Sequence, residues 1–139
     1  MKKIPVTLLT VLFLLSTITA CKQQDVTKQQ VQTKKISNHE ITVKELQQKM
    51  AADSNIVILD VRTPQELNGP LGHINGVINI PVQVLEKNLD KIEKYKNHEL
   101  YVICRSGHRS GIATKILSSK GFNPTNVLGG MIEYNKIKK

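Results

Sequence analysis

The sequence predicts a three-layer α/β domain with a mainly parallel sheet, and three observations support this fold class. Short apolar runs, such as residues 56–59 and 100–103, are typical of strands buried on both faces of a parallel sheet. Segments with apolar residues at helical spacing alternate with these runs. The alternation begins near Glu40 and covers about 100 residues, which is the size of one domain.

The first half of this domain contains a capped helix, two strands and a second helix. Thr42 and Glu45 have the spacing of a capping box, which predicts a helix that runs to about residue 52. The strand at 56–59 ends in Asp60, and one helical turn is expected at 64–67. A loop follows at 72–76, and a short strand at 77–80 is stopped by Pro81. Apolar residues then recur at helical spacing over residues 82–95.

The second half is organised around a cysteine that follows an apolar strand. The strand at 100–103 leads to Cys104 and a polar loop, and a helix is expected over 111–120, with Ser110 opening it and Gly121 ending it. A last strand at 126–128, a turn at Gly129 and Gly130, and a helix at 131–137 complete the domain.

The setting of Cys104 predicts a reactive thiol. N–H groups of the loop and of the following helix point toward an atom held above the cysteine. The positive end of the helix dipole, the neighbouring Arg105 and Arg109, and the absence of an acid in the loop all favour the thiolate. The alternative is an inert buried cysteine, but that role does not fit a residue followed at once by Arg-Ser-Gly-His-Arg-Ser.

The N-terminus resembles the signal of a bacterial lipoprotein. Two lysines precede an apolar run over 4–18 that is too short to span a bilayer comfortably, and small residues stand just before Cys21. This resemblance implies cleavage before Cys21 and its acylation, so that residues 1–20 form a signal peptide. A plain secretory signal or an uncleaved anchor are the alternatives. If Cys21 is acylated, Cys104 remains a single free thiol in an oxidising compartment.

Residues 21–39 are rich in Gln, Lys, Thr and Ser, and we interpret them as a flexible tether between the lipid and a domain over residues 40–139. The formal net charge is +9, or +7 without residues 1–20. Nucleic acid is excluded as a partner, because the chain has few aromatic residues and no binding motif. The lipoprotein-like signal implies a location in the cell envelope, lipid-anchored and facing outside the cytoplasm, in the periplasm or at the cell surface, which also argues against a nucleic-acid partner.

Four segments together resemble a single-domain rhodanese: Leu-Asp-Val-Arg at 59–62, Gly-His-Ile-Asn-Gly-Val-Ile-Asn-Ile-Pro at 72–81, Cys-Arg-Ser-Gly-His-Arg-Ser at 104–110 and Leu-Gly-Gly-Met at 128–131. The resemblance covers residues 41–134. It implies the three-layer rhodanese fold, with a central five-stranded, mainly parallel sheet flanked by helices, and a persulfide formed on Cys104.

The resemblance also implies roles for the loop residues. Cys104 is the expected nucleophile, Asp60 and Arg62 are expected to support the loops, and the expected substrate-binding residues are Arg105, Ser106, Gly107, His108, Arg109 and Ser110. Ser110 could also be only a helix cap. Four residues lie between Cys104 and Arg109. Relatives that act on phosphate or arsenate have a longer loop, so its length favours sulfur.

Three functions remain open at this stage. The first is a membrane-tethered sulfurtransferase that passes sulfur from thiosulfate or another sulfane donor to a thiol, cyanide or protein acceptor. The second is a phosphatase or arsenate reductase, and the third is a non-catalytic, redox or sulfur-carrier module. We expect a monomer that needs no cofactor, and the spacing of the histidines and cysteines predicts no metal site.

Overall fold

The computed structural model describes residues 39–137. The expected signal peptide over residues 1–20, the lipidation site Cys21 and all of the expected tether except His39 lie outside this range, and they stay predictions. Among the helices of the described range, none is long and apolar enough to cross a membrane.

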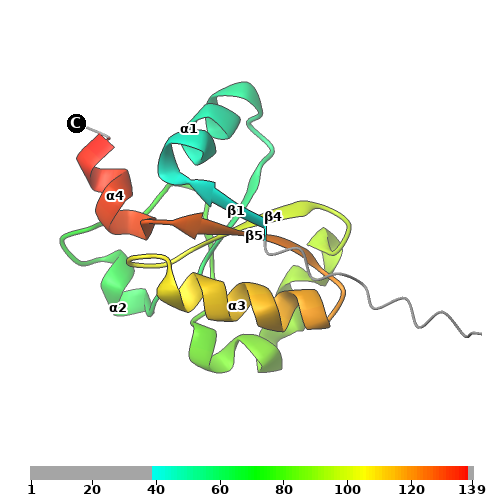
Figure 1. The fold of residues 1–139 in the computed structure, drawn as a ribbon. Helices are drawn as coiled ribbons and strands as arrows, with labels where there is room; N and C mark the ends of the chain where they lie inside the picture. The colour runs from blue at the N-terminus through cyan, green and yellow to red at the C-terminus, as the bar shows by residue number, and fades with distance from the viewer. Residues whose placement is uncertain (1–38, 138–139) are drawn as a thin grey trace, which may run out of the picture. The chain divides into compact units, whose positions relative to one another are not determined.

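The centre of the domain is a five-stranded sheet whose neighbouring strands all run parallel (Figure 1). This confirms the predicted fold class. The strand order is β1-β5-β4-β2-β3, and the strands are β1 (His39–Thr42), β2 (Val57–Asp60), β3 (Ile78–Asn79), β4 (Glu99–Ile103) and β5 (Asn123–Leu128).

The strand β1 has no counterpart among the elements that the sequence predicts, and it includes His39, the last residue of the expected tether. His39 pairs with Thr125 of β5, so it belongs to the sheet. Three of the four β1 residues are exposed, so the strand carries no apolar alternation that a sequence pattern could reveal. Its hydrogen bonds to β5 define it instead.

Helices cover both faces of the sheet (Figure 1). The helices α1 (Val43–Ala52) and α4 (Gly130–Ile137) pack on one face, and η1 (Val82–Tyr95) and α3 (His108–Ser119) pack on the other. The side chains of β4 alternate between the two cores: Leu100 and Val102 lie with α3 and η1, whereas Tyr101 and Ile103 lie with α1 and α4. The short helix α2 (Pro64–Leu67) follows β2.

Local sequence signals predict some helix boundaries better than others. The capping box of Thr42 and Glu45 is present at the start of α1, as predicted. The helix expected over 82–95 is present as a 3-10 helix that is interrupted at Asn88, with φ −128° and ψ 26°. The Asn88 side chain donates to the Val84 carbonyl, and such local bonds compete with regular helix geometry.

The helix after the cysteine starts earlier than the sequence suggests. The helix α3 begins at His108, so Ser110 lies within its first turn and does not open it. Gly107 precedes the helix in a left-handed conformation with φ +100°, which a glycine adopts without strain. The loop around Cys104 is therefore tighter than predicted, and the helix N-terminus lies closer to the thiol.

Candidate active site

Cys104 lies at the carboxyl end of β4, next to the carboxyl end of β2. The four apolar residues of β4 are buried, and Cys104 is itself only 1% exposed. In the sheet, Asp60 of β2 pairs with Ile103, the residue before the cysteine. In open α/β sheets, ligand sites form at this edge, outside the carboxyl ends of the strands.

The Cys104 sulfur accepts hydrogen bonds from the residues that follow it. The Gly107 N–H donates to Sγ at 3.1 Å. The Ser110 hydroxyl lies 3.4 Å from Sγ and 3.0 Å from the Gly107 carbonyl oxygen, so it can donate to either. Ser110 is fully buried. The first turn of α3 therefore supplies a side-chain donor to the sulfur, and Ser110 is not merely a cap.

These donors favour the thiolate form of Cys104. Burial alone would raise the pKa of the thiol, but hydrogen bonds from Ser110 and from the N–H groups of Ser106 and Gly107 outweigh it and lower the pKa below its ordinary value. A lowered pKa of the Cys104 thiol is also what the sequence predicts. The main cause of the lowered pKa is hydrogen bonding from the loop and the first turn of α3, however, whereas the sequence points to the two arginines and the helix dipole.

The N-terminus of α4 holds the backbone of the cysteine loop. The Met131 N–H donates to the Cys104 carbonyl at 2.9 Å, and the Ile132 N–H donates to the Arg105 carbonyl at 3.0 Å. A Cβ atom on Gly130 would lie only 2.5 Å from the Cys104 carbonyl oxygen, so only glycine fits there. The Gly-Gly turn is thus a structural support of the cysteine loop.

The two arginines of the loop have different surroundings. Arg105 is exposed, and its guanidinium has no hydrogen-bond or ion-pair partner among residues 39–137. Arg109 is bound on both terminal nitrogens by the Glu66 carboxylate, at 2.6 and 2.7 Å. Paired, parallel bonds of this kind are the strongest that arginine forms with a carboxylate. Only one of the two positive charges expected around the thiol is therefore without an acidic partner.

Glu66 is the site residue that sequence reasoning missed. It lies in α2 and forms a capping box with Thr63, and the hydrogen bonds from Arg109 are the main reason that its pKa falls to about 2. The sequence does carry a signal, because Thr63 and Glu66 repeat the spacing of Thr42 and Glu45 directly after β2. The contact with Arg109, 43 positions away, has no such signal.

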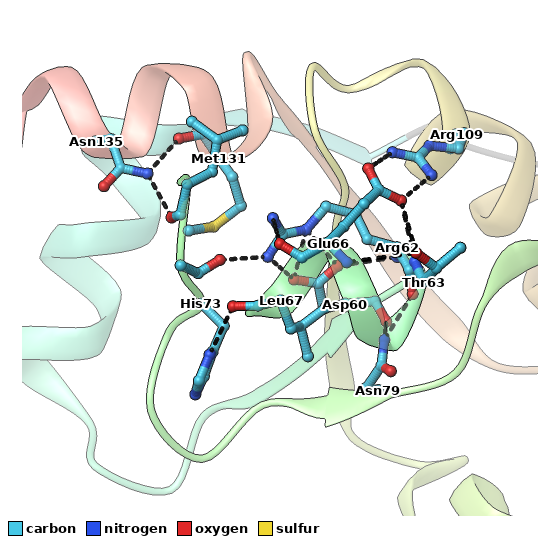
Figure 2. A network of polar contacts seen from close by, with 12 residues as sticks. Asp60, Arg62, Thr63, Glu66, Leu67, His73, Asn79, Arg109, Met131 and Asn135 are labelled. Carbon is cyan, nitrogen blue, oxygen red and sulfur yellow. Dashed lines mark hydrogen bonds and ion pairs between the residues drawn. The ribbon is translucent and has the colours of Figure 1, made fainter. Parts of the chain in front are cut away.

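A second arginine–carboxylate pair lies beneath the first and is completely buried (Figure 2). Arg62 contacts Asp60 through Nε and Nη2, the shortest distance being 2.7 Å. The same guanidinium donates to the carbonyl oxygens of Gly72 at 2.8 Å and Glu66 at 3.3 Å. Asn79 donates to the Asp60 and Arg62 carbonyls. This network holds the loops after β2 in place.

The loop between α2 and β3 forms one wall of a cavity beside the cysteine loop. Asn135 of α4 donates to the Leu71 carbonyl at 2.7 Å, and Arg62 donates to that of Gly72. The cavity has a volume of about 500 Å³ and is lined by Arg62, Gln65, Glu66, Gly69, Pro70, Leu71, Arg105 and Ile132. It is large enough for a small organic molecule.

The structure brings most of the predicted site residues to this edge of the sheet. Ser106 and His108 are exposed on the loop and at the start of α3, and they make no side-chain hydrogen bond within residues 39–137. Gly107 and Ser110 are buried next to the sulfur. No cluster of three or more metal-ligating side chains is present in this part of the chain.

Comparison with known proteins places this arrangement in a family. The model of the rhodanese-like domain matches residues 42–137, nearly the whole described domain. The chain therefore belongs to the rhodanese-like family, whose members include sulfurtransferases and sulfur carriers.

Individual relatives agree with this assignment. The chain is 36% identical over 96 residues to the "Putative sulfur carrier protein YrkF" of Bacillus subtilis, and the match covers 68% of this chain but only half of that protein. It is 33% identical over 73 residues to the thiosulfate sulfurtransferase PspE of Escherichia coli, covering 52% and 68% of the two chains. A rhodanese-like domain protein from Staphylococcus aureus superposes with a TM-score of 0.63 at 32% identity, covering 69% and 90%.

Proposed function

We propose that this protein is a sulfurtransferase of the cell envelope that carries sulfane sulfur as a persulfide on Cys104. The observation that carries the proposal is the hydrogen-bonded, low-pKa thiol at the end of β4. A thiolate is the reactive form of cysteine, and a ring of N–H groups suits a sulfur atom that carries negative charge.

The reaction consists of two displacements at sulfur. The Cys104 thiolate attacks the outer sulfur of thiosulfate, the S–S bond of the donor breaks, and sulfite leaves with the electron pair. A nucleophilic acceptor, such as a thiolate, cyanide or a protein cysteine, then attacks the outer sulfur of the persulfide, and the Cys104 thiolate is restored. Neither step requires a proton shuttle, so His108 needs no acid–base role. Each step balances without a cofactor.

The sulfur-carrier alternative has support of its own, because one of the relatives is named a sulfur carrier. A carrier would load sulfur on Cys104 but pass it only to a specific protein. A phosphatase is disfavoured, because only four residues separate Cys104 from Arg109 and the last of them, His108, already belongs to α3.

Steady-state assays separate the three possibilities. We expect the full chain to transfer sulfur from thiosulfate to cyanide, and Cys104→Ser to lose this activity, because a serine hydroxyl is not ionised at neutral pH and cannot hold a persulfide. Residual turnover within about tenfold of the wild type, only ~1.4 kcal/mol in barrier, would exclude Cys104 as the nucleophile. Hydrolysis of an aryl phosphate with no reaction of thiosulfate would contradict the proposal. Formation of the Cys104 persulfide without transfer of its sulfur to cyanide would favour the sulfur-carrier alternative.

We also propose that Cys21 carries the lipid that holds the protein on a membrane, facing outside the cytoplasm, with the sulfurtransferase domain acting as a monomer. The support is the apolar run and the small residues before Cys21, and two or more acyl chains suffice for stable anchoring. Cys21→Ser should release the protein from the membrane fraction or leave it unprocessed. Unchanged processing and lipid labelling would contradict this assignment.

A further inference from the structure

The charges around the cysteine loop are unequal in a way that bears on the sulfur donor. Three guanidinium groups belong to the site, and two of them are neutralised: the fully buried Arg62 by Asp60, and the partly exposed Arg109 by Glu66. The third, Arg105, has no acidic partner within residues 39–137. The mouth of the site is its entrance between Arg105 and the Glu66–Arg109 pair. Because Arg105 is the one guanidinium there without an acidic partner in the described residues, the mouth suits a sulfur donor with one negative charge better than a dianion.

The lining of the cavity beside the cysteine loop indicates which chemical group the sulfur donor carries. Arg105 and Glu66 both line this cavity of about 500 Å³, together with the apolar side chains of Pro70, Leu71 and Ile132. Thiosulfate has only a few atoms and no apolar surface, so it gains nothing from these walls. An organic group attached to the sulfane sulfur would bury apolar surface there, which is favourable.

We propose, on the basis of the proposed sulfurtransferase function, that this site selects singly charged organic sulfane-sulfur donors over the thiosulfate dianion, and that Glu66 determines this selectivity. Glu66 lies in the cavity wall and occupies both terminal nitrogens of Arg109. It thereby removes one dianion-binding group and cancels the positive charge that would attract the second charge of a dianion.

The chemistry of such a donor balances in the same way as that of thiosulfate. With benzenethiosulfonate, the Cys104 thiolate attacks the terminal sulfur, the S–S bond breaks, and benzenesulfinate leaves with the electron pair. One negative charge leaves with the product and one stays on the persulfide. No oxidant, reductant or proton is needed.

The test is equilibrium binding of two probes, thiosulfate and benzenethiosulfonate, to the full chain with Cys104→Ser, in which no sulfur can be transferred. We expect benzenethiosulfonate to bind more tightly than thiosulfate. Adding Glu66→Gln should tighten thiosulfate binding about three- to tenfold, because Arg109 then becomes available for a charge-assisted bond at a partly exposed site. Benzenethiosulfonate binding should change less.

Glu45→Gln is the matched control, since Glu45 occupies the same capping-box position in α1 but contacts no arginine. It should leave both affinities unchanged. An equal effect of Glu45→Gln and Glu66→Gln, or an unchanged ratio of the two affinities in Glu66→Gln, would overturn the role of Glu66. Tighter binding of thiosulfate than of benzenethiosulfonate before Glu66 is changed would overturn the selectivity without any further variant. Because these readouts need no catalysis, they are independent of whether the wild type turns over.

Discussion

The two arginine–carboxylate pairs at the end of β2 have similar contacts but very different exposure. Asp60 and Arg62 are at most 1% exposed, whereas the side chains of Glu66 and Arg109 are 32% and 26% exposed. The buried pair also binds backbone carbonyls of the surrounding loops. The chain therefore uses one ion pair to shape the backbone of the site and the other to set the charge at its mouth.

The largest expected effect is the loss of unfolding free energy when the buried pair, Asp60 and Arg62, is broken. Arg62→Met leaves the Asp60 carboxylate buried without its partner, and loss of one partner of a buried pair costs about 3–5 kcal/mol. Arg109→Met should cost less, about 1–2 kcal/mol, because its bidentate pair with Glu66 is partly exposed and screened by solvent. Urea unfolding measures both values. Equal losses would show that the difference in burial has no energetic consequence.

The exposed pair should give stability a specific pH dependence. The pKa of Glu66 is about 2 in the folded protein, below the ordinary value of 4.5, mainly because of Arg109. The stabilisation is therefore fully present above about pH 4.5 and is lost as the pH falls toward 2. The Glu66→Gln variant should be less stable than the wild type by about 1–2 kcal/mol near neutral pH, after allowance for solvent screening.

The same unfolding measurements, repeated down to about pH 2, check this prediction. The difference between wild type and Glu66→Gln should shrink through the range from 4.5 to 2. A difference that stays constant across this range would mean that Glu66 stabilises the fold without its charge.

The smallest effect concerns the two capping boxes. Thr42→Ala and Thr63→Ala each remove an N-cap side chain, which costs about 1 kcal/mol. Only Thr63 also contacts the carboxylate that holds Arg109. Both variants should lose similar stability, but only Thr63→Ala should change the affinity for thiosulfate. If Thr42→Ala changes the affinity for thiosulfate as much as Thr63→Ala does, the prediction is wrong, because the affinity then responds to any loss of stability and not to the contact between Thr63 and Glu66.

The sequence reveals much of this site because most of its parts are local. The apolar strand before Cys104, the glycine at 107 and the Gly-Gly turn each have short-range signals. The exposed strand β1 has a weaker sequence signal, because its backbone pairing with β5 determines it. The start of α3 at His108 also has a weaker signal, because the left-handed conformation of the preceding glycine determines it. The Glu66–Arg109 pair joins α2 to α3, and only the folded chain brings them together.

The most direct test of the account is the intact mass of the purified protein after incubation with a sulfane-sulfur donor and removal of the excess. Thiosulfate and benzenethiosulfonate should each add one sulfur atom, located on Cys104 by peptide mapping and removed by cyanide. Cys104→Ser should gain none. Added sulfur on another residue, or no added sulfur with either donor, would contradict the claim that Cys104 carries sulfur.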